Sequence, residues 1–409
     1  MTMSRARDFI GKALGLLVAV VTGGCDMAAS PDGGGGDPQR RVVTIAESGA
    51  TNNATLSIPR YKIYQQEGAP ERLWVGLGME SGDDTFFSAD GGESWTAVAA
   101  MGWEYHMSLD GNADGFVHFI DRGDPAATYH RLRGTEFQPE HRTMFSDFGG
   151  ETTSGNIAVN GREVVIFTRN QESDRDPIHY HRSTDNGETW ESGTIAGTGN
   201  PSNLRHRIGS VIVDGEISLA YWRAGGAEDG DTVTLFRWNG SEFEQLDHVY
   251  TTAARSPWTR EYAVTQDSAG TIHLVTWDLV DGEKVVRHSR RTLESEWSDP
   301  ETVVRWDNDE IMPQLSAVGD RIVLVYQYSS ESSEDADAQA FYRVWSPETG
   351  WAREGRRLSS DDSGAVRYPI APQEVSPGSE FIPVVWTEAR SGLLSDGYAV
   401  RYTPLALER

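Results

Sequence analysis

The sequence predicts an all-β fold, a β-propeller of seven four-stranded blades, with six blades as the alternative. Three observations support this prediction. Two octapeptides, Ser88–Trp95 (SADGGESW) and Ser183–Trp190 (STDNGETW), place Ser, Asp, Gly and Trp at the same offsets, about a hundred residues apart. Short apolar segments recur along the chain after turns that contain glycine. No window of about eleven residues sustains the i, i+3, i+4, i+7 pattern of an amphipathic helix.

The repeated unit consists of a glycine turn, an apolar strand, a loop, and a strand rich in Tyr, Phe and Arg. The turns carry Gly68, Gly115, Gly161, Gly215, Gly270, Gly319 and Gly378. The apolar strands are LWVGLGM, FVHFIDR, EVVIFTR, ISLAYWR, IHLVTWD, IVLVYQY and FIPVVWTEA. The next strands are DTFFS, TYHRL, IHYHR, VTLFRW, VVRHSRR, AFYRVW and YAVRYTPL. Successive glycines lie 46 to 59 residues apart, which suits four strands per unit.

The last unit runs out of chain at Arg409 before a fourth strand. The strand-like segment before the first complete unit is Arg41–Glu47 (RVVTIAE). We expect it to supply the missing strand, because pairing the two ends of the array removes exposed sheet edges. Residues 41–409 are therefore predicted to form a single propeller domain.

Composition and charge exclude several classes of protein. Of the 409 residues, 38% are hydrophobic and 10% aromatic, which is enough for a large core and too apolar for a disordered chain. The formal net charge is −26, which argues against nucleic acid as a partner and against direct adhesion to anionic lipid. No cofactor and no metal is expected, since the acidic loops lack a calcium-binding spacing.

The first 24 residues have the order of a secretory signal peptide. Arg5, Arg7 and Lys12 precede the apolar run 13–21, and small residues follow. Cys25 is the single cysteine, so no intramolecular disulfide can form. Its position resembles the lipidated cysteine of bacterial lipoproteins, although Thr22 stands where that family usually has Leu. The resemblance implies cleavage before Cys25, a flexible tether over 25–40 and attachment to the cell envelope by lipid alone. The alternative is an ordinary signal peptide.

The octapeptides resemble the Asp-box, the bacterial neuraminidase repeat of sialidases and other propellers. The matching positions are Ser88, Asp90, Gly92, Trp95, Ser183, Asp185, Gly187 and Trp190. Degenerate copies are HSRRTLESEW (288–297) and SPETGW (346–351). The resemblance implies that each box joins the third and fourth strands of a blade on the face away from the ligand. The box residues are therefore expected to stabilise the fold, not to act on substrate.

Residues at the starts of the first strands are expected to gather on the opposite face. They include arginines and aromatic residues, which suit an acidic carbohydrate, because Arg pairs with carboxylates and aromatic rings stack on sugars. The candidate substrate-binding residues are Arg60, Arg207, Arg260, Arg367, Trp103 and Trp258. The alternative is a rim of salt-bridged arginines without a ligand. We expect a monomer.

Two resemblances suggest catalysis. Sialidases use a Tyr nucleophile assisted by Glu, with arginines on the substrate carboxylate; here Tyr262 with Glu261, or Tyr368, would fill these roles. The family's Arg-Ile-Pro stretch is altered, because Ser57 takes the Arg position. The segment 103–119 resembles seven-bladed polysaccharide lyases of acidic algal glycans, which implies His106 and Tyr105 as base or acid. Hydrolysis of a terminal acidic sugar is the leading prediction, elimination is the alternative, and a non-catalytic binding propeller is a third reading.

Overall fold

The computed structural model describes residues 41–51, 54–56, 61–80, 82–100, 106–121, 127–138, 142–145, 152–170, 177–198, 208–223, 231–251, 262–306, 312–328, 338–360, 363–390 and 397–406. Residues 40–409 form one compact unit. In the described ranges the chain consists of strands and turns without a helix, which confirms the all-β prediction. Accordingly, no helix capable of crossing a membrane occurs in these ranges.

The largest sheet joins the first described strand to the last. Its strands, in order, are β28 (Val366–Ile370), β29 (Phe381–Ala389), β30 (Tyr398–Ala406), β1 (Val43–Ala50), β3 (Leu73–Met79), β4 (Gly82–Ser88) and β5 (Thr96–Ala100), with β2 (Ile63–Gln65) paired to β3. Strands β1 and β30 pair antiparallel through Val43↔Tyr402, Thr44↔Arg401, Ala46↔Val400 and Ala50↔Tyr398. By contrast, β1 meets β3 only through Ala50↔Met79.

Five further antiparallel sheets follow along the chain. The second contains β6 (His106–Gly111), β7 (Phe116–Asp121), β8 (Ala127–Arg133), β9 (Glu136–Phe137) and β10 (Thr143–Phe145). The third contains β11 (Thr152–Asn160), β12 (Glu163–Asn170), β13 (Ile178–Ser183) and β14 (Glu191–Ile195). The fourth contains β15 (Ile208–Val213), β16 (Glu216–Arg223), β17 (Asp231–Trp238) and β18 (Phe243–Thr251). The fifth contains β19 (Tyr262–Gln266), β20 (Ile272–Val280), β21 (Glu283–Arg291) and β22 (Glu301–Trp306). The sixth contains β23 (Gln314–Val318), β24 (Arg321–Tyr328), β25 (Gln339–Ser346), β26 (Gly350–Trp351) and β27 (Arg356–Arg357).

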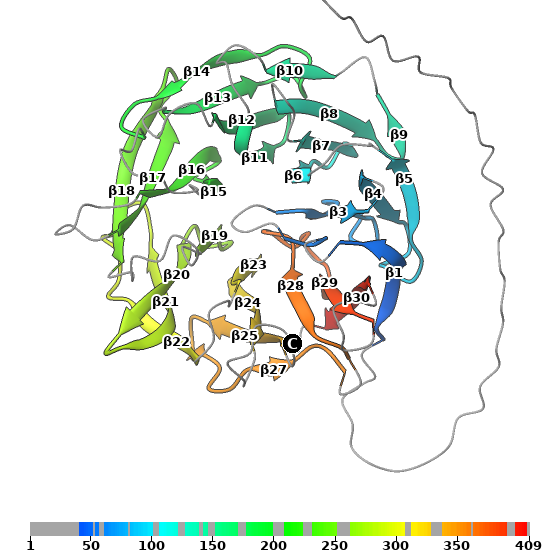
Figure 1. Ribbon diagram of the computed structural model, residues 1–409. Helices are drawn as coiled ribbons and strands as arrows, with labels where there is room; N and C mark the ends of the chain where they lie inside the picture. Colours follow the sequence, from blue (N-terminus) through cyan, green and yellow to red (C-terminus); the bar gives the residue numbers. More distant parts are fainter. Residues whose placement is uncertain are drawn as a thin grey trace, which may run out of the picture. The chain divides into compact units, whose positions relative to one another are not determined.

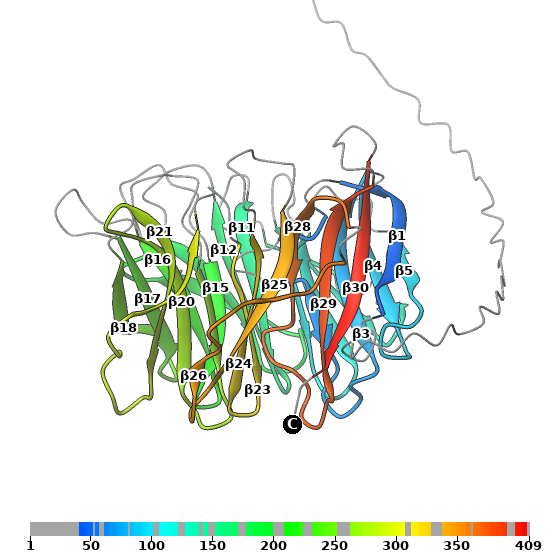
Figure 2. The ribbon, with the colours of Figure 1, turned by 90° about the horizontal axis from the view of Figure 1, so that it is seen from below.

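Every predicted apolar strand and every predicted Tyr-, Phe- and Arg-rich strand is a strand in the structure. The sheets stand around a common centre, with β6, β11, β15, β19, β23 and β28 nearest to it (Figure 1). Seen from the side, the strands run from one end of the unit to the other (Figure 2). This arrangement is that of a β-propeller.

The core lies between the faces of neighbouring sheets. One apolar cluster, for example, joins Val275 and Trp277 of β20 to Leu324 and Tyr326 of β24, and others follow between successive sheets. Trp74, Trp222 and Trp386 are the largest fully buried side chains. Because strands alternate their side chains between two faces, each sheet contributes to two such clusters.

Two polar side chains cross the centre and tie distant sheets together. The Tyr61 hydroxyl lies 3.1 Å from the Val264 carbonyl oxygen and 3.2 Å from that of Leu315. The Gln373 amide donates to the carbonyls of Ser210 and Val264. Carbonyl groups of the innermost strands are therefore bonded to side chains from other sheets, which satisfies acceptors that no further strand covers.

Candidate functional site

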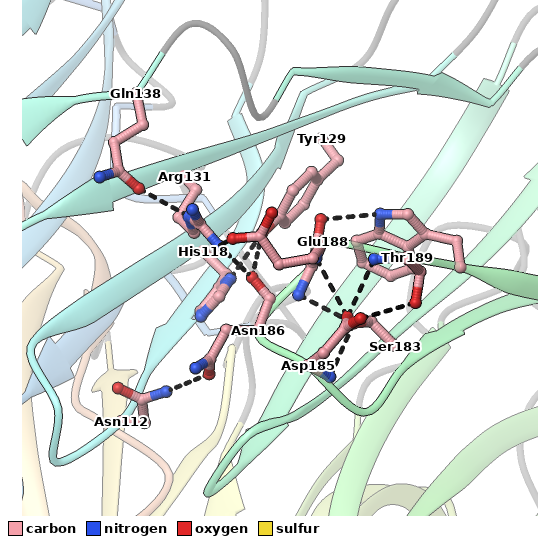
Figure 3. A network of polar contacts seen from close by, with 12 residues as sticks. Asn112, His118, Tyr129, Arg131, Gln138, Ser183, Asp185, Asn186, Glu188 and Thr189 are labelled. Carbon is pink, nitrogen blue, oxygen red and sulfur yellow. Dashed lines mark hydrogen bonds and ion pairs between the residues drawn. The ribbon is translucent and has the colours of Figure 1, made fainter.

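The octapeptide Ser183–Trp190, here called a box together with Ser88–Trp95, forms a hairpin closed by its own side chains (Figure 3). The Ser183 hydroxyl donates to Asp185 at 2.7 Å and accepts from the Gly187 N–H at 2.8 Å. The Thr189 hydroxyl donates to the other Asp185 oxygen at 2.6 Å. Burial alone would raise the pKa of Asp185, but the hydrogen bonds from Thr189 and Ser183 outweigh it and lower that pKa to about 2.

The box at Ser88–Trp95 repeats this geometry. Ser88 donates to Asp90 at 2.8 Å and accepts from the Gly92 N–H at 2.8 Å. The box glycines are required twice over, by positive φ and by crowding. At Gly187, φ is +81°, and a Cβ would lie 2.1 Å from the Tyr129 hydroxyl oxygen. Backbone conformation and packing therefore both favour glycine at these two positions.

The box hairpin is bonded to the glycine turns beside it. Asn112, in the turn between β6 and β7, donates to the Asn186 side chain at 2.9 Å and to the Gly161 carbonyl at 2.8 Å. Arg131 donates to the Asn186 carbonyl at 2.6 Å and is paired with Glu188 at 3.0 Å (Figure 3). Glycine turns and boxes therefore share one end of the sheets, here called the turn end. The other end, where β6, β19, β23 and β28 begin, is called the entry end.

Most of the predicted catalytic and substrate-binding residues lie outside the described residues, and so does the predicted lipidation site. These residues are Arg60, Arg207, Arg260, Trp103, Trp258, Tyr105, Glu261 and Cys25. His106 begins β6 with its backbone paired to Asp121, but its side chain is not described. The described candidates at the entry end are therefore Tyr262, Arg367 and Tyr368.

Tyr262 corrects the sequence interpretation. Its side chain is fully buried in the cluster between the fourth and fifth sheets. Its hydroxyl donates to the Ala220 carbonyl at 2.7 Å. A nucleophile must reach its substrate, and this phenol is enclosed with its proton bound to a strand carbonyl. Tyr262 is thus a core residue, and the strand start alone did not reveal which way its ring points.

Arg367 and Tyr368 lie together at an irregularity of β28. The register with β29 shifts between Arg367↔Thr387 and Ile370↔Val385, so two residues oppose Trp386. Tyr368 has φ of +50°, and its N–H donates to the Gln327 side chain at 2.9 Å. Such a β-bulge bends a strand and re-aims its side chains. Thr55 bonds the Thr387 hydroxyl at 2.8 Å and fixes the chain beside the bulge.

Sequence reasoning missed Met312, Gln314 and Gln327 at the same end. Met312 and Tyr368 are buried and in contact, with Leu56 packed against them. Each of the two precedes a proline, Pro313 or Pro369, at the start of an innermost strand. A bulky residue directly before a proline, at both Met312 and Tyr368, was the signal in the sequence that could have pointed to these positions. Within the described ranges, no group of three or more His, Cys, Asp or Glu residues is placed to hold a metal.

No family model matches the chain, and no curated protein matches it. Solved structures do resemble it. The polysaccharide lyase Uly1 is 12% identical, with 89% of this chain and 91% of that chain covered and a TM-score of 0.51. A mutant of AofleA from Arthrobotrys oligospora is 10% identical, with 79% and 90% covered and a TM-score of 0.50. The six-bladed fucose-recognising lectin of Aleuria aurantia is 11% identical, with 77% and 99% covered and a TM-score of 0.48. At these identities the likeness to the first two structures shows the fold alone.

Proposed function

We propose that this chain is an Asp-box propeller that binds an acidic glycan at its entry end. The observation that carries the proposal is the bulge of β28, at which an arginine, Arg367, and a tyrosine, Tyr368, follow one another in the chain at the entry end. Guanidinium groups pair bidentately with carboxylates, and aromatic faces stack on sugar rings. On a chain of net charge −26, an arginine-rich end would be a local reversal of sign.

Hydrolysis of a terminal acidic sugar is the leading reaction, with Tyr368 as the candidate nucleophile; because its ring is buried against Met312, this role requires that contact to open when the sugar binds. A neutral phenol can approach an anionic sugar that would repel a carboxylate. Elimination from a uronate-containing glycan is the alternative, with His106 or Tyr105 as base and arginine neutralising the carboxylate. The fold likeness to a polysaccharide lyase over 89% of the chain favours keeping this second candidate.

The proposal is tested by incubating the protein with a panel of sialosides and polyuronates. Released sugar would support hydrolysis, new ultraviolet absorbance from an unsaturated product would support elimination, and saturable binding without product would support a binding module. Arg367→Ala is expected to weaken binding at least about tenfold. The matched control is Arg162→Ala, because Arg162 is exposed at the turn end. Equal losses in both variants would contradict the choice of end.

We also propose seven four-stranded blades, with β1 as the outer strand of the last. The support is the strand order β28-β29-β30-β1 and the slight pairing of β1 with β3.

The proposal for the N-terminal region is export and a lipid anchor on Cys25. Phase partitioning of wild type and Cys25→Ser tests the anchor, and equal recovery of both in the aqueous phase would contradict it.

A further inference from the structure

Two bulky residues at the entry end hold an unfavourable backbone conformation. Met312 has φ of +43° and Tyr368 has φ of +50°. The other non-glycine residues with positive φ in the described ranges are Asn186, Asp214 and Asp281, whose short polar side chains tolerate that region. Met312 and Tyr368 also precede prolines, which further favours extended backbone. Such a backbone conformation is strained and persists where the surroundings enforce it, often at ligand sites.

Gln314 lies next to this strained pair. It is 0% exposed, and neither amide atom has a hydrogen-bond partner in the described part of the chain. Ser316, two residues further on and hence on the same side of β23, donates to the Pro372 carbonyl. Met312, on the other side of Gln314 in sequence, contacts Tyr368. From this alternation we infer that the Gln314 side chain faces the segment 368–372, which contains the end of β28.

A buried amide without hydrogen bonds is unfavourable, and an apolar side chain of the same length would avoid that cost. We propose that Gln314 is a recognition residue for a hydroxyl group of the glycan, covered by the Met312–Tyr368 contact until the sugar binds. This inference rests on the proposed function. An amide offers a donor and an acceptor, which is what a sugar hydroxyl can use, while Arg367 takes the carboxylate.

The test compares Gln314→Met with Gln266→Met, a control at the turn end whose amide bonds the Gly270 carbonyl. Gln314→Met is expected to keep or raise the melting temperature while weakening glycan affinity at least about tenfold. Gln266→Met should leave affinity unchanged. Affinity equal to wild type in Gln314→Met would overturn this inference alone, whereas a wild type that binds no acidic glycan would overturn the proposed function as well. Met312→Gly should speed association in stopped-flow measurements, and an unchanged rate would contradict the cover.

A separate cluster supports a second, independent inference. His273 and His288 are fully enclosed, their rings are stacked 5.2 Å apart at 7°, and His273 Nδ1 lies 3.0 Å from His288 Nε2. His273 Nε2 lies 3.1 Å from Asp267. Each of these two hydrogen bonds requires one proton. Two neutral imidazoles satisfy both bonds when His288 Nε2–H donates to His273 Nδ1 and His273 Nε2–H donates to Asp267.

His288 Nδ1 ends this series of hydrogen bonds, and its two partners require opposite protonation states of that nitrogen. The Trp351 indole N–H lies 3.1 Å away and needs an unprotonated Nδ1. Glu301 lies 3.0 Å away, and its carboxylate needs a protonated Nδ1. The other titratable or charged groups facing His288 are the neutral His273 ring and Arg290, and Trp345 contacts both imidazoles. Burial lowers the pKa of His288, although the Glu301 hydrogen bond opposes the shift.

We infer that His288 is an acid-sensitive switch that exchanges Trp351 for Glu301 when Nδ1 takes a proton. Trp351 belongs to β26 and His288 to β21, so the exchange acts on the contact between the fifth and sixth sheets. The folded state holds the neutral ring better than the unfolded chain does. Stability from this site is therefore present above the ordinary histidine pKa of about 6.5 and is lost as the pH falls below it.

Imidazole nitrogen NMR shifts of His288 across pH test the switch. Glu301→Gln is expected to move protonation of Nδ1 to lower pH, because the amide no longer offsets the positive charge. The control is Glu296→Gln, an exposed glutamate in the same hairpin. Trp351→Phe should shift protonation the other way, since the competing donor is gone. Identical titrations in wild type and Glu301→Gln would overturn the inference.

Discussion

The two ends of the sheets treat a similar backbone conformation differently. At the turn end, Asn186 has φ of +61°, and its N–H, carbonyl and side chain are all hydrogen-bonded to neighbouring turns or strands. At the entry end, Tyr368 and Met312 hold positive φ with large side chains before prolines, beside an unbonded buried amide. Strain at the turn end is offset by hydrogen bonds of Asn186 with β8 and with the two neighbouring glycine turns. At the entry end it is held by the packed sheets, which is the pattern expected where a ligand acts.

The largest effect is expected from removing β1, because β1 pairs along β30 and so joins the first described strand to the last. Deleting residues 41–50 removes the pairing with β30 and the partly buried Val43 and Ile45. The free energy of unfolding should fall by on the order of 5 kcal/mol, and the newly exposed edge should promote aggregation. Thermal melts and light scattering measure this. Deleting residues 26–40 is the control, and equal melting temperatures for both deletions would contradict a structural role for β1.

Trp190→Ala should give the next largest effect, at the turn end. Trp190 packs edge-on against Tyr129 and Phe145, at 4.8 and 5.2 Å between ring centroids, and its N–H donates to the Gly187 carbonyl. The side chain is only partly buried, so we expect a loss of about 2–3 kcal/mol, below the full range for a buried Trp. Trp190→Phe should lose about 1 kcal/mol. Chemical denaturation measures both, and a loss under 1 kcal/mol in Trp190→Ala would show that the box Trp contributes little.

Two substitutions at Asn186 separate the contribution of its side-chain hydrogen bond from that of its backbone strain. Asn186→Gly keeps the positive φ free of strain but loses the bond to Asn112, so a cost of about 1 kcal/mol is expected. Asn186→Ala loses the same bond and adds the left-handed strain of about 1–2 kcal/mol. Equal stabilities for the two variants in denaturant would mean that the hairpin tolerates this conformation without cost.

The smallest effect is the acid dependence of the boxes. The folded-state pKa of Asp185 is lowered to about 2, and that of Asp90 is also lowered. A depressed carboxyl pKa contributes stability above the unfolded value of about 4, which is lost as the pH falls toward about 2. Asp185→Asn should flatten the stability profile in that window. An unchanged acid limb in the variant would argue against these hydrogen bonds in solution.

The strands and boxes were predictable because their determinants are local. Gly187 and its turn, the apolar run after Gly161, and the strand at 41–47 are each visible within a few residues. The entry end was only partly predictable. The sequence gives no sign that the Tyr262 ring enters a sheet interface, because that depends on packing between β16 and β19. Nor does it reveal that Gln314 lacks a partner, since that results from residues distant in the chain.

The pairing of β1 with β30 has a consequence for how the chain is made. The bond between Thr44 and Arg401 spans 357 residues. At synthesis rates of about 5–20 residues per second, the first strand waits on the order of 20 to 70 s for its partner. During that interval the edge of β1 that pairs with β30 has no native neighbour. Among the described strands, β1 is therefore exposed to mispairing for the longest time. A holding chaperone, or passage through a membrane pore before folding, would shelter β1 until its partner emerges.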